Sequence, residues 1–502
     1  MKKSISVVIL FVLVVFGLWG ATTYWFSVKT EERYRSILQE ASQTQYVKFV
    51  NESYNRGFLR STARTILQIQ TPSGTTPDDG PLRITLAHDI THGPFPFGGA
   101  SSGEGRLKPL MAIIETRIVF GPEAKSYLAE LYSQIPELAS VRDTTVIDLG
   151  GNGEDRFSVP AFQHSFGDED KVAVDWKGLS LQVNFTSDLK GFTGSLSCPG
   201  LGIAGKELDF SMAEVKSAFN SHEGIHGLSL GEASFDLAGL EFKDKSETGP
   251  HSFLARGFKV SASNKASGDS IQCLLTVSND QVKYDEAQYG PAVFELELRN
   301  LDAASLAKLQ QAIREMQAQD PQQSAEAMQI MMLAKYGEIL PALLMKSPEI
   351  EIKQLDLKTS DGDFTGRAKV AFDGTKSGPA LNPATLMNAV TVQAQFKAAE
   401  GLVHRLASTF MQKKTSGEDA EDSGAAPGDE ETAGDKEASG EREDPGTQTP
   451  ESSPTMVDEQ LKALIEQNII VKENGSYAAT LNYKDGEIVL NGRPLSLQNL
   501  MQ

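Results

Sequence analysis

Two histidine-containing segments have the residue types and spacing found in metal-dependent hydrolases. The first, His222-Glu-Gly-Ile-His226, satisfies the H-E-x-x-H pattern, in which a helix places both histidines on one face and the glutamate acts as a base. Gly224 and Gly227 interrupt such a helix, and the following residues alternate as in a strand. On a strand, side chains four residues apart are separated by about 13 Å. We therefore predict a turn between two strands, with His222, Glu223 and His226 as the alternative zinc ligands.

The second segment, His88-Asp89-x-x-His92, also offers metal-ligand side chains. It lies at the end of an expected strand, just before Gly93-Pro94. Hydrogen bonds to backbone groups in a tight turn are the competing interpretation. A metal-dependent periplasmic hydrolase using either histidine set is the alternative functional hypothesis.

Other catalytic signatures are missing from the sequence. It contains no G-x-S-x-G elbow, no P-loop and no Rossmann glycine run. Cys198 has no histidine near it in sequence that could activate a thiol nucleophile. We therefore expect a non-enzymatic protein with no catalytic residue, no cofactor and no metal.

The two cysteines and a methionine-rich segment leave alternatives open. Cys198 and Cys273 could form a disulfide or remain free thiols. A helix expected between Asp320 and Met345 could bind an acyl chain or a protein, or pack against a sheet, through its methionines: Met328, Met331, Met332 and Met345.

The elements that would carry these residues follow a hydrophobic run from Ile5 to Phe26, which begins just after Lys2-Lys3. At about 1.5 Å per residue a helix of this length crosses a bilayer core of roughly 30 Å. The run exceeds a signal-peptide core, and no small-x-small cleavage site closes it. We predict an uncleaved, single-pass anchor in a bacterial inner membrane, with most of the chain in the periplasm and the membrane as a partner.

The charge distribution argues against a nucleic-acid partner. The formal net charge is -20, and residues 415–454 carry 13 acids and 2 bases, which supply 13 − 2 = 11 of the negative charges. No basic stripe exists elsewhere to neutralise phosphates. Because that segment lacks aromatic residues, Leu, Ile and Val, we predict a disordered acidic insert.

The remaining pattern predicts an α+β fold: an N-terminal transmembrane helix followed by an elongated, mostly antiparallel β-sheet body with flanking helices. Asp302 is expected to cap a helix from Ala303, and Asp485-Gly486 to turn a hairpin. The expected regions are an anchor (1–28), an α+β region (29–155), a β meander (156–300), a helix-plus-sheet region (301–412), the acidic insert (413–454) and a closing helix and hairpin (455–502).

Four short motifs follow one another along the chain: the apolar N-terminus, Tyr54-x-Arg56-Gly57-Phe58-x-x-Ser61, His92-Gly93-Pro94, and a closing segment with Gly492 and Pro494. In this order they resemble the YdgA-like family of bacterial inner-membrane-anchored proteins of unknown function. The resemblance implies a membrane anchor and a periplasmic body, and it brings no reaction. We expect these motif residues to be structural. The first functional hypothesis is a sheet body that binds a lipid or an envelope-protein partner, and a structural homo-oligomer is a further alternative.

Overall fold

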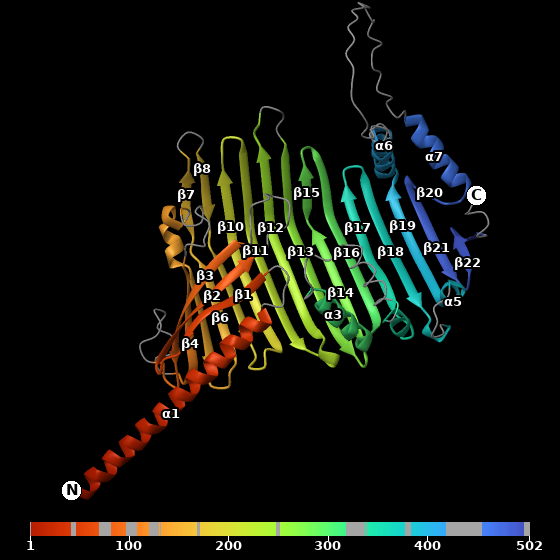
Figure 1. Cartoon of the computed structure of the whole chain (residues 1–502). Coiled ribbons are helices and arrows are strands. Elements are labelled where there is room, and N and C mark those ends of the chain that lie inside the picture. Colours follow the sequence, from red (N-terminus) through yellow and green to blue (C-terminus); the bar gives the residue numbers. More distant parts are fainter. Residues whose placement is uncertain are drawn as a thin grey trace, which may run out of the picture.

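The strands of this protein form one continuous antiparallel sheet (Figure 1). The computed structural model describes residues 2–41, 47–69, 82–96, 108–119, 130, 132–167, 171–246, 251–317, 337, 339–376, 383–417 and 454–495. The mostly antiparallel, α+β character expected from the sequence is confirmed.

The strands are longest in the middle of the sheet. The first half comprises β1 (Val47–Asn55), β2 (Arg60–Ile69), β3 (Leu82–His92), β4 (Leu110–Val119), β5 (Arg142–Asp148), β6 (Gly153–Val159), β7 (Phe162–Phe166), β8 (Val172–Trp176), β9 (Leu179–Phe185), β10 (Gly191–Ala204), β11 (Leu208–Glu223) and β12 (Ser229–Asp244). The second comprises β13 (Ser252–Ser267), β14 (Ser270–Asn279), β15 (Gln281–Tyr284), β16 (Ala287–Asp302), β17 (Glu349–Thr359), β18 (Gly362–Phe372), β19 (Val390–Ala399), β20 (Val471–Glu473), β21 (Ser476–Lys484), β22 (Glu487–Leu490) and β23 (Arg493–Leu495).

The described helices are fewer and lie outside this ladder. They are α1 (Lys2–Ala41), α3 (Ala303–Gln317), α5 (Pro383–Ala389), α6 (Glu400–Gly417) and α7 (Pro454–Glu466), with short 3-10 turns η1 (Pro136–Ser140), η2 (Ile225–Gly227) and η3 (Gly374–Lys376).

Strand neighbours follow chain order almost throughout. Consecutive strands pair from β1 to β6, β6 then pairs with β9, and β9 pairs with β10. The β7–β8 hairpin attaches to the second half of β10. From β10 the meander continues to β14, then β16 to β19 and β21 to β23. The two chain ends therefore lie at opposite ends of the sheet (Figure 1).

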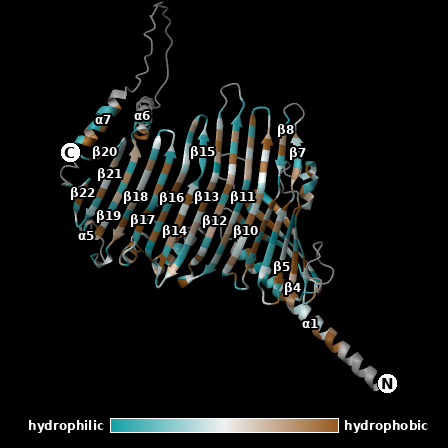
Figure 2. Cartoon of the chain, turned by 180° about the vertical axis from the view of Figure 1, so that it is seen from behind, coloured by the Kyte–Doolittle hydropathy of each residue, from teal (hydrophilic) through white to brown (hydrophobic). Residues whose placement is uncertain are grey.

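Period-two alternation gives the sheet one apolar and one polar face, because successive side chains on a strand point to opposite sides. Hydrophobic and hydrophilic residues accordingly alternate along the strands in Figure 2. Directly paired residues share a face, so the register defines rows that cross the sheet. One row runs through Phe157, Leu181, Leu196, Ser217, Phe235, Val260, Val277, Phe294, Leu355, Gly366, Phe396 and Ala479.

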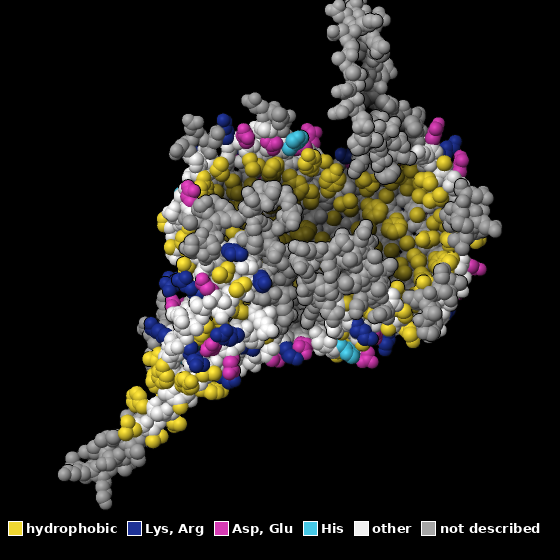
Figure 3. Space-filling view, in the orientation of Figure 1, with side chains coloured by type: hydrophobic (Ala, Val, Ile, Leu, Met, Phe, Trp, Pro, Cys, Tyr) yellow, Lys and Arg dark blue, Asp and Glu magenta, His cyan; other side chains and the backbone are white. Residues whose placement is uncertain are grey.

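We call the face that carries this row the inner face. It is hollowed and lined with hydrophobic side chains in Figure 3. The adjacent row on the opposite, outer face is polar over most of its length: Asn184, Thr193, Asn220, Glu232, Ser263, Leu274, Glu297, Glu351, Lys369, Gln393 and Asn482.

Helices cover parts of the inner face at three places. Near the N-terminus, Tyr34 of α1 packs with Ala63, Ile90 and Ala112. In the middle, Ala303 of α3 belongs to a cluster with Ile271, and towards the C-terminus α6 and α7 pack around Tyr477. The core is thus a set of local clusters beneath helices.

The N-terminal helix runs past the end of the expected anchor region (1–28). It is one helix from Lys2 to Ala41, and its side chains are described from Leu13 to Gln39. Within the described part of the chain, no helix has both the length and the apolarity required of a membrane span.

Several local predictions are confirmed. The segment around His226 is a turn, η2, between β11 and β12, and Asp485-Gly486 turns the β21–β22 hairpin with both residues at positive φ (51° and 83°). The helix α5 was not expected. Most of the methionine-rich helix and most of the acidic insert lie outside the described residues.

The N-cap of α3 generates a stability prediction. The buried Asp302 carboxylate accepts hydrogen bonds from the backbone N–H of Ser305 (2.8 Å) and from its hydroxyl (2.6 Å). Asp302→Ala should therefore lower the free energy of unfolding by about 1–2 kcal/mol. Urea denaturation measures this, with the exposed Asp363→Ala as control. Equal losses in both variants would contradict the cap.

Candidate functional site

The two N-terminal motifs meet in one junction between the β1–β2 turn and the end of β3. The Ser61 hydroxyl lies 2.7 Å from Nε2 of His92, although the two residues are 31 positions apart. The same hydroxyl accepts a hydrogen bond from the Gly57 N–H at 3.1 Å, and the His92 N–H donates to the Leu59 carbonyl at 2.9 Å. Ser61 and His92 are almost fully buried, so this pair has no access to a substrate.

Steric crowding explains the glycines of this junction. A Cβ on Gly57 would lie 2.0 Å from the Arg60 carbonyl oxygen, and one on Gly93 would lie 1.6 Å from that of Leu110. Pro94 follows, and its carbonyl accepts a hydrogen bond from the Leu110 N–H. These contacts support a structural role. Gly492 and Pro494 lie in the β22–β23 turn and in β23, at the other end of the sheet.

The other motif residues attach α1 to the sheet. The Arg56 guanidinium lies 5.8 Å from the ring centroid of Tyr24, and its Nη1 is 3.6 Å from Oε2 of Glu31. The Phe58 ring contacts Trp19 edge-on, with centroids 6.4 Å apart. The motif therefore fixes the direction in which α1 leaves the sheet.

A buried chain of polar groups lies beneath α1 on the inner face. Tyr34 Oη is 2.7 Å from Thr65 Oγ1, which is 2.8 Å from His88 Nε2. His88 Nδ1 is 3.0 Å from Thr116 Oγ1, and Thr116 hydrogen-bonds to Asp143. We call these five residues, together with Asp155, the polar relay.

Two arrangements of protons satisfy the relay. Either Tyr34 donates to Thr65, Thr65 to Nε2 of His88, Nδ1–H to Thr116 and Thr116 to Asp143, or a protonated Asp143 starts the same chain of donation in the opposite direction. The imidazole is neutral in both, which agrees with burial lowering the pKa of His88 to about 4. Burial also lowers the pKa of His92 to about 4. Both histidines are therefore uncharged near neutral pH.

The relay ends in two carboxyl groups. Burial, followed by the charge of Asp155, raises the pKa of Asp143 to about 7. Asp143 and Asp155 are hydrogen-bonded to each other, and Asp155 Oδ1 also accepts from the Thr145 hydroxyl at 2.7 Å. Asp143 therefore keeps its proton below neutral pH, beside Asp155.

Neither histidine set forms a metal site. Among the residues that the structure describes, no three His, Cys, Asp or Glu side chains are grouped so that they could hold a metal ion. His88 points into the relay, whereas Asp89, next to it on the same strand, points to the other face and pairs with Arg117. The ligand interpretation of His88, Asp89 and His92 is therefore wrong on geometric grounds.

The H-E-x-x-H segment is not helical either. His222 and Glu223 end β11, and Glu223 pairs with Lys190 at 2.7 Å. His226 lies in η2 with φ 54° and ψ 23°. The zinc alternative for His222, Glu223 and His226 is therefore wrong, because it needs a helix that this segment does not form.

The cysteines are free thiols, Cys198 on β10 and Cys273 on β14. Three strands separate β10 from β14, which corresponds to roughly 19 Å at 4.8 Å per strand. A disulfide requires Cα atoms within about 7 Å, so the alternative of a Cys198–Cys273 bond is wrong.

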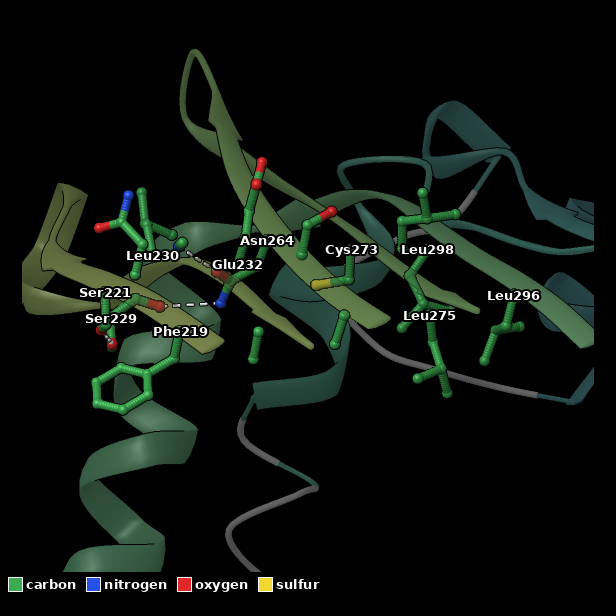
Figure 4. Close-up of a pocket in the computed structure, with 16 residues that line it drawn as sticks. Phe219, Ser221, Ser229, Leu230, Glu232, Asn264, Cys273, Leu275, Leu296 and Leu298 are labelled. Carbon is green, nitrogen blue, oxygen red and sulfur yellow. Dashed lines mark hydrogen bonds between the residues drawn. The ribbon is translucent and has the colours of Figure 1, made fainter. Parts of the chain in front are cut away.

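A pocket of about 490 Å³ lies on the strands between β11 and β16, near α3 (Figure 4). Cys273, Leu275, Leu296 and Leu298 line one end of it, and Ser221, Ser229 and Asn264 lie at the other. Asn264 is fixed there, because it donates to the Ser229 carbonyl (2.9 Å) and accepts from the Gly231 N–H (2.7 Å). The pocket is therefore apolar with one polar end, which suits an amphiphilic ligand.

Sequence reasoning missed the relay and this pocket. Tyr34, Thr65, Thr116, Asp143 and Asp155 come from α1 and four strands, and no local spacing joins them. One signal was available in the alternation of side chains along the strand. His88 lies on the same strand face as the apolar Leu86 and Ile90, which indicates that it is buried.

Comparison with known families decides the relationship. The model of a family described as "Bacterial protein of unknown function (DUF945)" matches residues 1–498. The chain belongs to this family. No curated protein and no solved structure gives a significant match to it. Membership in the DUF945 family therefore gives a bacterial origin and no activity.

The junction glycine provides a sharp test. Gly93→Ala places a methyl group against the Leu110 carbonyl and should reduce the free energy of unfolding by about 3 kcal/mol or more. Gly492→Ala is the matched control: it has φ +77° but open space around it, and should cost only about 1 kcal/mol. Chemical denaturation distinguishes the two. A Gly93→Ala protein as stable as the control would show that the junction relaxes.

The carboxyl pair predicts a pH effect. The contribution of neutral Asp143 is complete below its ordinary pKa of 3.8 and is lost as the pH rises to about 7. Asp143→Asn keeps a neutral group that can accept from Thr116 and donate to Asp155. Its melting temperature should exceed that of the wild type at pH 8 and converge with it near pH 4. The exposed Asp363→Asn should follow the wild type at every pH. A constant offset between Asp143→Asn and wild type would refute this titration.

Proposed function

We propose that this protein is a non-enzymatic, membrane-anchored bacterial cell-envelope protein whose inner face binds the acyl chains of a lipid. In finer terms it would be a YdgA-like member of its family, single-pass in the inner membrane, with its body in the periplasm. The observation that carries the proposal is the unbroken apolar register of the inner face.

Three adjacent rows support the acyl-chain assignment. Besides the row through Phe235 and Phe294, a second runs Val183, Gly194, Phe219, Ala233, Ala262, Leu275, Leu296, Ile352, Ala368, Ala394 and Leu481. A third includes Cys273, Leu298, Ile350, Val370, Val392 and Tyr483. These rows carry no charged side chain between β9 and β21, so a hydrocarbon chain would meet only apolar and neutral groups.

Exposure identifies the part of this surface that remains accessible. On the inner face Phe235 is 37% exposed, Ile350 49% and Val370 37%. We call the inner-face surface of β11–β19 the apolar trough. Contiguous apolar surface of this kind on a soluble body marks a binding site, because leaving it in water costs about 25 cal/mol per Å².

The position of α1 favours a lipid over a protein as the occupant. Its apolar run, Ile5 to Phe26, is the segment expected to enter the bilayer, while Tyr34, the first residue of the relay, packs on the inner face. The anchor and the trough therefore belong to the same face. Lipid is the apolar ligand available at that boundary.

The chemistry of the buried groups agrees with a role without catalysis. Ser61, His88 and His92 resemble a serine–histidine set only in type, since their hydrogen bonds join β2, β3 and β4 to one another. Each of these contacts stabilises the sheet under α1.

Lipid analysis of the detergent-extracted full chain tests the proposal. Mass spectrometry should find co-purified phospholipid, and Phe235→Gln/Ile350→Gln should lower the lipid-to-protein ratio by about tenfold, since two partly exposed apolar contacts are lost. Both sites are accessible, so the fold should survive, as circular dichroism would verify.

The matched control changes the outer face of neighbouring strands. Ser261→Gln/Thr365→Gln introduces the same side chains on β13 and β18, on the opposite side of the sheet. It should keep the wild-type lipid ratio. Absence of lipid from the wild type, or equal loss in both double variants, would remove the trough as the binding site.

A further inference from the structure

We propose that the β1–β2 turn and the end of β3 dock into the headgroup layer of the bilayer beside α1, forming a second membrane contact. The surface consists of apolar and aromatic side chains that we call the aromatic collar: Trp19, Tyr24, Trp25, Phe58, Leu59 and Phe95. This inference rests on the proposed anchorage and adds a contact made by the sheet itself.

Exposure sets the collar apart from the junction that supports it. Phe58 is 47% exposed, Leu59 48% and Phe95 40%, although Ser61 and His92 directly beneath them are at most 2% exposed. On α1, Tyr24 and Trp25 are likewise about half exposed. Large apolar side chains thus lie on the solvent side of the turn whose inner side holds the buried Ser61 and His92.

Contacts hold the collar in one place on the molecule. Phe58 packs edge-on against Trp19, and its ring also lies beside Gly20, 3.6 Å from the position that a Cβ would take there, which is an ordinary van der Waals distance. Leu59 is tied to β3 through the hydrogen bond between its carbonyl and the His92 N–H. Phe95 follows three residues later. The sheet residues therefore meet α1 at the level of Trp19 to Trp25.

That level is where a membrane interface is expected. Tyr and Trp rings favour the headgroup region, and Leu13, Phe16 and Leu18, which are more than 60% exposed, continue the apolar helix surface away from the sheet. Phe58 and Leu59 would enter the same layer, as apolar side chains of peripheral segments do.

The net charge of the N-terminal region is opposite in sign to that of the rest of the chain. Residues 13–119 contain 11 Lys or Arg and 9 Asp or Glu, a net charge of +2, so the rest of the chain carries -22. Arg56 and Arg60 flank the Gly57–Leu59 tip, and Figure 3 shows Lys and Arg side chains gathered where α1 meets the sheet. A basic rim around exposed aromatics suits anionic phospholipid.

Site-specific photocrosslinking of the full chain in phosphatidylglycerol/phosphatidylethanolamine vesicles tests this. A benzophenone amino acid replaces Phe58 or Leu59 in turn, and Tyr284, 53% exposed on β15, is the matched control position. Lipid adducts at 58 and 59 should exceed those at 284 by about tenfold. Adducts to protein alone, or yields equal to those at 284, would overturn the collar.

Flotation with the vesicles separates this outcome from failure of the anchorage. A chain that does not float with the vesicles would contradict the proposed membrane attachment and the collar together. A chain that floats but gives no lipid adduct at 58 or 59 would contradict the collar alone. Lipid that co-purifies with the detergent-extracted chain, before vesicles are added, reports on the trough through its dependence on Phe235 and Ile350.

Discussion

The structure depends on one constraint: each strand must keep its register with both neighbours, because a slip by one residue would exchange the two faces. Where the ladder is irregular, the irregularity preserves the faces. Between β16 and β17, Phe294 pairs with Leu355 and Leu296 with Ile352. Strand β17 therefore has one extra residue near Lys353, a β-bulge, and both pairs stay on the inner face. The apolar rows are therefore a property of the entire ladder.

The outer face shows how such a sheet remains soluble on one side. Arg299 contacts Glu297 (2.9 Å) and Glu349 (2.8 Å), and Lys353 contacts Glu295 (3.0 Å), so charges of opposite sign cover β16 and β17. Among the described residues, the three apolar rows of the trough carry no charged side chain. At the N-terminal end the polar relay and the Ser61–His92 junction join α1 to the sheet, so that helix and sheet act as one body.

Alternation in the sequence was sufficient for the mostly antiparallel sheet, and Asp485-Gly486 for the hairpin at that turn, because both signals are local. It was not sufficient for the relay. His88 and His92 looked like ligands through their spacing, yet the partners that decide their roles, Thr65 and Ser61, come from another strand. The pairing of β6 with β9 was also unpredictable. It requires the intervening β7–β8 hairpin to pair with β10 instead of lying between β6 and β9. Register and burial are collective properties that local patterns do not contain.

The continuous ladder also restricts how chains of this architecture can vary in length. Removing one residue from β13 would turn half of that strand over and bring Lys259 or Lys265 towards the apolar inner face. Insertions between α6 and α7 leave every strand register untouched, because neither helix belongs to the ladder. Length differences among homologues should therefore concentrate in segments such as 418–453, while the strands tolerate exchange of residues but not their gain or loss.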